Sequence, residues 1–467
     1  GLGDVYKRQE QYMADPLLKA VKDGEIEESL VDEKVRNILR MMLRLKMIGP
    51  ERKHRKTGAY NTEEHRRAVL DVARESMILL KNEDQVLPLQ AESGCKVAVI
   101  GVNAAAIHSN GGGSAEIKAL YEISPLMGIK KLLGGNVKVS YAPGYVIPDK
   151  KEASEINWQA ASTETAEDTE KESTVSGRTL DEKQQEALAE AVALAKASDI
   201  VIFVGGLNHD FDVEGLDRVN MKLPYGQDEV IDALLKAVPD TVVCMYAGAP
   251  VEMPWAEKAK AILWSYYAGM EGGTALAEIL SGKVNPSGKL AETFIRDASQ
   301  CPAHTIGTFG KKDRVEYREG VMVGYRYYDT KKTDVLFPFG HGLSYTAFTY
   351  NDLEIIRQQE NGRQTVKVSC SVTNTGEHAG KETVQIYVAP EQKKDRPVHE
   401  LKAFEKVRLD AGETKRICVI LEERDFFRYD TDKKMPVPVN GTYEIQVGAS
   451  STDICLCGKI DLFFAEG

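Results

Sequence analysis

Five charged side chains and one histidine gather in the ten-residue stretch HDFDVEGLDR (209–218). The stretch directly follows DIVIFVGG (199–206), an apolar run typical of a buried strand. Neighbouring negative charges raise the proton affinity of a carboxylate, which a general acid working near neutral pH requires. Glu214 is therefore the candidate acid, with Asp210 and Asp212 as the neighbouring charges.

A solvated acidic loop has the same composition, and spacing alone does not choose between these two interpretations. Asp217 and Arg218 are placed to form an ion pair that would anchor the loop. A metal site made of His209, Asp210 and Asp212 is a further alternative, although we predict that the chain holds no metal.

A second polar segment, NAAAIHSNGGGSAE (103–116), follows the apolar run KVAVIGV (96–102). Its three consecutive glycines, 111–113, allow the backbone to approach a ligand closely, and Ser114 adds a hydroxyl group. A plain flexible loop is the alternative interpretation. The segment lacks the G-x-G-x-x-G pattern of a dinucleotide site, and no glycine spacing fits a P-loop, so both kinds of phosphate site are excluded.

Apolar runs alternate with helical patterns along residues 96–282. The expected strands are 96–102, 137–142, 199–206, 241–248 and 261–267, and the expected helices are 122–135, 186–198, 227–238 and 272–282. Continuous apolar strands that alternate with helices predict a mostly parallel sheet covered on both faces. Ligands bind outside the carboxyl ends of such strands, which is where the segments of Glu214 and Ser114 begin.

The remainder of the chain has a different character. The first nine residues, GLGDVYKRQ, read as a cloning scar. Residues 29–49 predict one amphipathic helix, because apolar side chains recur there at helical spacing. A polar, acidic stretch within 146–180 is expected to be a surface insertion. After about residue 345 the apolar residues alternate in short strands separated by turn residues, which predicts an antiparallel β-sandwich of immunoglobulin type.

Composition excludes several classes of protein. The formal net charge of −11 argues against a nucleic-acid partner and against a basic membrane-binding surface. The longest apolar runs are far shorter than the roughly 20 residues that span a bilayer. The seven cysteines are irregularly spaced without a C-x-x-C pair, which favours free thiols in a reducing compartment, so we expect a cytoplasmic protein.

Taken in order, these stretches resemble glycoside hydrolase family 3, in its β-glucosidase and β-xylosidase branch. The matching motifs are VDEKVRNILRMMLRLKMIG, ARESMILLKNEDQVLPL, VAVIGVNA, GGGSAE, VEGLDRVNMKLPYGQDEVI, GAPVEMPW, YYAGMEGGTALAEILSGKVNPSGKLAETF, YREGVMVGYRYYD, LFPFGHGLSYTAFTY and VTNTGEHAGKETVQIYVAP. Ten motifs in the order of the family make the resemblance specific, and they extend over most of the chain.

The resemblance implies three domains: an N-terminal (β/α)8-type barrel, an α/β sandwich, and a fibronectin type III-like, immunoglobulin-like β-sandwich. The helix at 29–49 matches the end of the barrel domain, and no segment before Gly58 matches the part of the barrel that bears the nucleophile. We therefore expect a fragment. Its expected parts are a scar, barrel-end helix and linker at 1–57, the α/β sandwich domain with its mostly parallel sheet at 58–345, and the fibronectin type III-like domain at 346–467.

The resemblance also implies roles for individual residues. In the family the barrel supplies the nucleophile and the second domain supplies the acid/base, so the match of VEGLDR makes Glu214 the acid/base. The match of GGGSA implies that Ser114 contacts the sugar at the non-reducing end. From their spacing, we expect Asp217 and Arg218 to support the loop that carries Glu214.

The implied activity is that of a retaining β-glycosidase acting on terminal non-reducing β-D-glucosyl or xylosyl residues. We expect the fragment alone to be inactive, because it has the acid/base without the nucleophile. The expected partners are an oligosaccharide or β-glucoside substrate and the absent barrel domain, and no cofactor is expected. The alternative is a non-catalytic carbohydrate-binding or structural module.

Overall fold

The computed structural model describes residues 13–54, 56, 58–148, 179–215, 217–309, 314–360, 363–391 and 396–464. The predicted scar at 1–9 and most of the predicted insertion at 146–180 lie outside these residues. The chain divides into two compact units, Gly1–Arg66 and Arg67–Gly467, and each is described by itself. Among the described residues, no helix has both the length and the apolar character needed to span a bilayer.

Among its described residues, the first unit contains the helices α3 (Asp15–Lys22) and α4 (Glu28–Arg44), so the helix expected at 29–49 is present. Neither helix buries any residue. On α4, Ile38 is 60 % exposed and Leu39 is 43 % exposed. An amphipathic helix normally gains its stability by burying its apolar side, and α4 leaves that side uncovered within its own unit.

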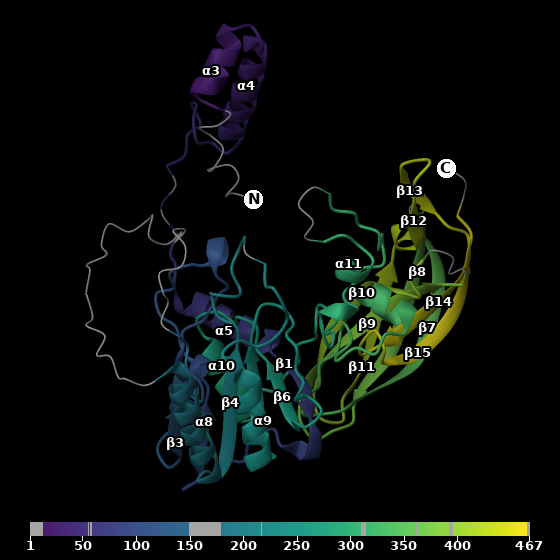
Figure 1. Cartoon of the computed structure of the whole chain (residues 1–467). Helices are drawn as coiled ribbons and strands as arrows, with labels where there is room; N and C mark the ends of the chain where they lie inside the picture. Colours follow the sequence, from purple (N-terminus) through teal and green to yellow (C-terminus); the bar gives the residue numbers. More distant parts are fainter. Residues whose placement is uncertain are drawn as a thin grey trace. The chain divides into compact units, whose positions relative to one another are not determined.

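The second unit begins with helix α5 (Glu63–Ser76), which crosses the division between the units, and a six-stranded sheet with the order β1-β6-β5-β4-β2-β3 (Figure 1). The strands β2 to β6 are parallel to one another and β1 runs antiparallel to β6, so the predicted mostly parallel sheet is confirmed. The strands are β1 (Ile78–Asn82), β2 (Lys96–Ile100), β3 (Lys138–Ala142), β4 (Ile200–Gly206), β5 (Val242–Tyr246) and β6 (Ala261–Trp264).

Helices cover both faces of this sheet. Along β4, Val201 and Phe203 pack into one apolar core with side chains of the helices α8 and α9, while Ile202 and Val204 pack into the opposite core with side chains of α5, α7 and α10. All four residues are at most 1 % exposed, which is why β4 reads as a continuous apolar run rather than an alternating one. The helices are α7 (Pro125–Leu133), α8 (Leu180–Lys196), α9 (Gln227–Ala237) and α10 (Gly272–Leu280).

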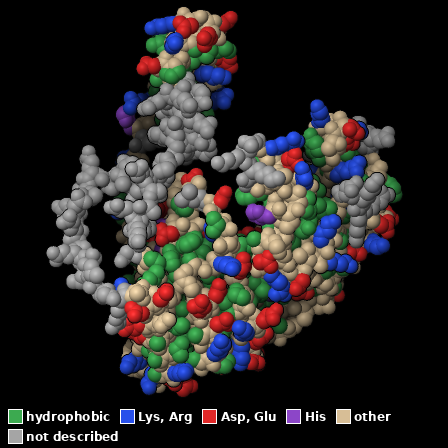
Figure 2. Space-filling view, in the orientation of Figure 1, with side chains coloured by type: hydrophobic (Ala, Val, Ile, Leu, Met, Phe, Trp, Pro, Cys, Tyr) green, Lys and Arg blue, Asp and Glu red, His purple; other side chains and the backbone are tan. Residues whose placement is uncertain are grey.

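Short helices connect these elements and lead to the second sheet system. They are α6 (Val102–Ala105), α11 (Pro302–Thr305), α12 (Tyr325–Lys331) and the 3-10 turns η1 (Glu83–Gln85), η2 (Gly113–Ala115), η3 (Ala298–Gln300) and η4 (Glu423–Phe426). On the visible face, Lys and Arg side chains are interspersed with Asp and Glu (Figure 2).

An antiparallel β-sandwich follows, as predicted, with sheets in the orders β10-β9-β14-β15 and β11-β8-β7 and a separate pair β12-β13. Its apolar core is built from alternating residues of both sheets, including Val368 and Val384. The strands are β7 (Phe348–Glu360), β8 (Arg363–Asn374), β9 (Gly380–Pro390), β10 (Glu400–Leu409), β11 (Thr414–Leu421), β12 (Phe427–Asp430), β13 (Met435–Pro438), β14 (Gly441–Gly448) and β15 (Ile454–Leu462).

Charged side chains join the α/β part to the β-sandwich. Glu75 of α5 forms ion pairs with Lys381 of β9 and Lys406 of β10. Nζ of Lys289 lies 3.1 Å from Oε1 of Glu382 on β9. Glu382 is only 4 % exposed, and its carboxylate also accepts a hydrogen bond from the hydroxyl of Tyr350. A buried charge is tolerated when it is paired and hydrogen-bonded. These contacts therefore connect the α/β part to the β-sandwich.

One half-buried carboxylate in this fold forms no ion pair among the described residues. Asp228, in the first turn of α9, accepts a hydrogen bond of 2.8 Å from the indole N–H of Trp255. The pKa of Asp228 is raised to about 6, chiefly by burial and further by the nearby charges of Glu252 and Asp232, while the hydrogen bond from Trp255 opposes the rise. The folded chain therefore favours the protonated form of Asp228 more than the unfolded chain does.

The pKa of Asp228 is higher in the folded chain than in the unfolded chain. The protonated carboxyl therefore makes its full contribution to the free energy of unfolding below about pH 4, and this contribution is lost as the pH rises through 6. Asp228→Asn keeps an acceptor for Trp255 without the charge. We expect its free energy of unfolding at pH 8 to exceed that of the wild type by roughly 1–2 kcal/mol, and to match it near pH 4. Urea denaturation at both pH values measures this difference, with the exposed Glu229→Gln on the same helix as the control. An equal gain at both pH values would contradict it.

Candidate active site

The loops that follow β2, β4, β5 and β6 leave the sheet at its carboxyl edge, the edge where ligands bind in parallel sheets. Glu214 and Ser114 lie in the loops after β4 and β2, which are neighbouring strands. The backbone N–H of Ser114 donates a hydrogen bond of 2.9 Å to Oε2 of Glu214. The structure thus brings together two residues that are 100 positions apart in the sequence, and both side chains are exposed.

Gly113 is required for this approach. Its φ of +78° is a conformation that side-chain-bearing residues seldom adopt, and a Cβ atom at this position would lie 2.5 Å from Cβ of Glu214. The neighbouring Gly112 donates its N–H to the carbonyl of Asp212 at 2.9 Å. The glycine run was predicted to let the backbone approach a ligand closely. In the structure it lets the backbone approach the loop that carries Glu214.

His209 makes a second link between the two loops. Its Nε2 lies 2.7 Å from the carbonyl oxygen of Asn110, and because a carbonyl only accepts, Nε2 carries the proton. Its other ring nitrogen lies 3.6 Å from a carboxylate oxygen of Glu116. His209 thus ties the glycine loop to the acidic loop.

The acidic side chains near Glu214 accept hydrogen bonds that stabilise the loop. Asp212 Oδ2 accepts two hydrogen bonds of 2.7 Å, from the N–H of Gly248 after β5 and from the hydroxyl of Tyr267 after β6. Asp210 accepts a hydrogen bond of 3.2 Å from Tyr225. Among the residues that the structure describes, no group of three His, Cys, Asp or Glu side chains is arranged to hold a metal ion, so His209, Asp210 and Asp212 do not form the alternative metal site.

Arg218 anchors the far end of the loop, but not through the predicted partner. Its guanidinium donates a hydrogen bond of 3.0 Å to the carbonyl of Pro250, in the loop after β5. Among the described residues no ion pair joins it to Asp217, whose side chain is exposed. The predicted Asp217–Arg218 pair is therefore wrong, and the half-buried Arg218 donates to a backbone carbonyl of another loop instead.

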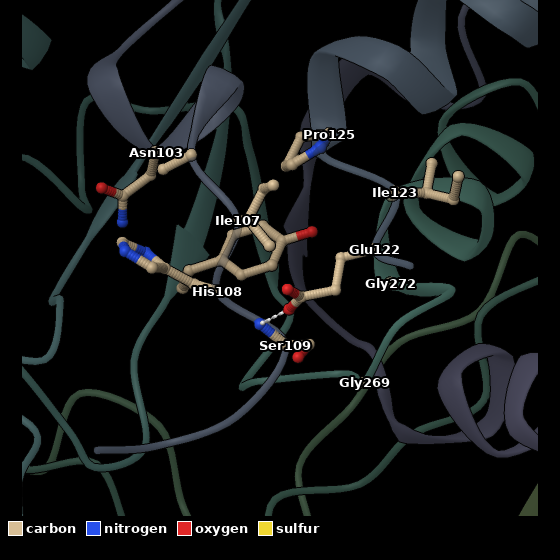
Figure 3. A pocket seen from close by; sticks show the side chains of 12 residues that line it. Asn103, Ile107, His108, Ser109, Glu122, Ile123, Pro125, Gly269 and Gly272 are labelled. Carbon is tan, nitrogen blue, oxygen red and sulfur yellow. Dashed lines mark hydrogen bonds between the residues drawn. The ribbon is translucent and has the colours of Figure 1, made fainter. Parts of the chain in front are cut away.

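A small pocket lies beside the glycine loop, lined by side chains that include Asn103, His108, Ser109 and Glu122 (Figure 3). Glu122 accepts a hydrogen bond of 3.2 Å from the backbone N–H of Ser109. Burial, and then the nearby His209, lowers the pKa of His108. The interior has room for about one water molecule, so a sugar would have to bind at the open edge beside Glu214 and not in this pocket.

The sequence interpretation missed the groups that hold the loop, above all Gly248 and Tyr267. The available signal was their position, since Gly248 and Tyr267 are the last residues of the expected strands 241–248 and 261–267. Their loops reach the same edge as Glu214, which marks them as neighbours but does not say which side chain they bind.

Comparison with known proteins shows which families the parts of the chain match. Residues 77–345 match the family described as the glycosyl hydrolase family 3 C-terminal domain, and residues 382–451 match the fibronectin type III-like domain. The chain is 38 % identical over 441 residues to thermostable beta-glucosidase B of Acetivibrio thermocellus, covering 94 % of this chain and 53 % of that protein. It is 35 % identical over 454 residues to an exo-alpha-(1->6)-L-arabinopyranosidase of Bifidobacterium breve, covering 95 % and 54 %.

Solved structures give the same picture. The GH3 beta-glucosidase of Bifidobacterium adolescentis is 33 % identical with a TM-score of 0.78, over 96 % of this chain and 60 % of that one. The beta-glucosidase of Kluyveromyces marxianus in complex with glucose is 27 % identical with a TM-score of 0.81, over 96 % and 69 %. The chain spans about half the length of the curated relatives named above.

Gly113→Ala should strain the contact between the two loops, because the new methyl group meets Glu214 and the backbone must hold a positive φ. We expect it to lower the free energy of unfolding by about 1–2 kcal/mol in urea denaturation. Gly111→Ala is the matched control, since its new Cβ would find no atom nearer than 4.0 Å and should change stability little. Equal losses in the two variants would contradict the close approach at Gly113.

Proposed function

Because the chain belongs to glycoside hydrolase family 3, we propose that it supplies the general acid/base, Glu214, of a retaining β-glycosidase. The observation that carries the proposal is the position of Glu214, exposed at the carboxyl edge of the sheet and oriented by the backbone N–H of Ser114. A general acid must reach the oxygen of the scissile bond, and an exposed carboxyl held in one place can do so.

The proposed reaction is a double displacement. Glu214 donates a proton to the glycosidic oxygen while a second carboxylate attacks the sugar, and Glu214 then takes a proton from the water that releases the covalent intermediate. In a retaining enzyme the two carboxyl groups lie about 5–5.5 Å apart. We propose that the nucleophile belongs to a barrel domain outside this sequence. The reaction consumes only water and uses protein carboxyl groups, so it requires no cofactor.

The proposed substrates are glycosides with a terminal β-D-glucosyl or xylosyl residue. The names of the relatives support glucose, and one solved relative is in complex with glucose. The relative that is an arabinopyranosidase has nearly the same identity to this chain, so the choice of sugar varies among proteins of this kind. Ser114 is proposed to contact the sugar at the non-reducing end, beside Glu214.

Two other groups of residues have proposed roles. Arg218, through its bond to Pro250, and Asp217 are proposed to support the Glu214 loop from its far end. The exposed apolar side chains of α4, such as Ile38 and Leu39, are proposed to pack against the barrel domain that would precede this sequence.

The test requires both halves of the site. The part of Acetivibrio thermocellus beta-glucosidase B that this chain does not match is joined in frame ahead of residue 10, and hydrolysis is compared with that of the chain alone. We expect activity in the joined protein and negligible hydrolysis by the chain alone. Glu214→Gln in the joined protein should lower kcat/KM for cellobiose about 10²–10⁴-fold, since a general acid contributes about that factor.

A substrate with a good leaving group needs little protonation, so the same variant should lose less than about tenfold in kcat/KM for glucosyl transfer from 2,4-dinitrophenyl β-glucoside. Glu190→Gln, an exposed change on α8, serves as the control. Equal losses on both substrates would contradict the acid role of Glu214. Absence of hydrolysis in the joined protein would favour the second candidate, a non-catalytic carbohydrate-binding module.

A further inference from the structure

We infer that Asp212 is the positioning residue for Glu214, and that it acts as a hydrogen-bond acceptor which fixes the loop to β5 and β6. The inference rests on the proposed role of Glu214 for its catalytic meaning. It differs from the expectation that Asp212 serves Glu214 as a neighbouring negative charge.

Asp212 connects the ends of four adjacent strands. It belongs to the loop after β4, and its Oδ2 accepts from Gly248 after β5 and from Tyr267 after β6, at 2.7 Å each. Its carbonyl accepts from the N–H of Gly112 in the loop after β2 at 2.9 Å. Its own N–H donates to the carbonyl of Asn208 at 2.9 Å. Asp212 therefore positions the acidic loop relative to the loops after β2, β5 and β6.

The surroundings of Asp212 leave little space for it to move. A Cβ atom at Gly248 would lie 3.3 Å from Oδ2 of Asp212, and one at Gly112 would lie 3.1 Å from its carbonyl oxygen. Both contacts would be tighter than ordinary van der Waals contacts, so glycine at these two positions allows the close hydrogen bonds. Both the carboxylate and the backbone carbonyl of Asp212 are thus held in place by their contacts.

The position of Asp212 determines the position of Glu214, which lies two residues later in the same loop. The glycine loop meets the acidic loop at two successive bonds, from Gly112 N–H to the Asp212 carbonyl and from Ser114 N–H to Oε2 of Glu214. The first bond comes from the buried Gly112, and the second ends on the exposed carboxylate of Glu214. If the buried bond is released, the exposed one loses its geometry, because hydrogen bonds weaken steeply with misalignment.

An acceptor is sufficient for this role. Both donors address the same oxygen, Oδ2, and no hydrogen bond to Oδ1 is recorded among the described residues. Burial, and then the hydrogen bond and charge of Asp212, raise the pKa of Tyr267, so its hydroxyl remains a donor at neutral pH. An asparagine can place its carbonyl oxygen where Oδ2 stands and keep both bonds.

The experiment uses the full chain, labelled with ¹⁵N-serine and ¹⁵N-glycine, and requires no catalysis. The amide signal of Ser114 is assigned from its loss in Ser114→Ala and followed through a pH titration. In the wild type the amide proton shift should follow the ionisation of Glu214, and in Glu214→Gln the shift should not titrate. Exchange of the Gly248 amide with deuterated solvent is measured in the same samples.

In Asp212→Ala we expect the amplitude of the Ser114 titration to fall by at least about half. Exchange at Gly248 should become about tenfold faster. Asp212→Asn should restore both readouts to wild-type values. Tyr267→Phe, which removes one donor and keeps the other, should give an intermediate amplitude and serves where Asp212→Ala does not fold.

An unchanged Ser114 titration in Asp212→Ala or in Tyr267→Phe would overturn the inference. Equal damage by Asp212→Asn and Asp212→Ala would also overturn it, because the charge rather than the acceptor would then matter. These readouts do not depend on hydrolysis. A failure here leaves the assay of the joined protein unaffected, and a failure of that assay leaves these spectra interpretable.

Discussion

The parallel strands of the α/β sheet end at one shared carboxyl edge, and this edge determines which polar groups of the candidate site meet. Because β2, β4, β5 and β6 are parallel and adjacent, the four loops that follow them emerge together, and polar groups far apart in the sequence become neighbours. The hydrogen bond from Ser114 to Glu214 exists only because two such loops meet. The buried faces of the sheet keep that edge in place.

The loop with Glu214 is held in the way a working carboxyl requires. Its acidic neighbours do not form a free cluster of charge, since Asp212 binds groups after β5 and β6 and Asp210 binds Tyr225. Arg218 fixes the other end at Pro250. The exposed Glu214 therefore stands between two residues, Asp212 and Arg218, that are hydrogen-bonded to the loop after β5.

The sequence predicted the sheet well, because buried parallel strands such as β4 are continuous apolar runs that need no partner to be recognised. It also indicated the two loops, since glycines and carboxylates after strands are local signals. It did not predict what Asp212 binds, because Gly248 and Tyr267 lie 36 and 55 residues away. The Asp217–Arg218 pair was predicted wrongly for the same reason, since closeness in sequence does not reveal a backbone acceptor in another loop.

We propose that Glu214 is the acid/base of a retaining glycosidase. The most direct measurement is product analysis for Glu214→Ala in the joined protein, with 2,4-dinitrophenyl β-glucoside and added azide. Azide attacks the covalent intermediate without a general base, so we expect faster turnover with azide and formation of β-glucosyl azide. No acceleration and no glucosyl azide, with an active unmutated joined protein, would contradict it.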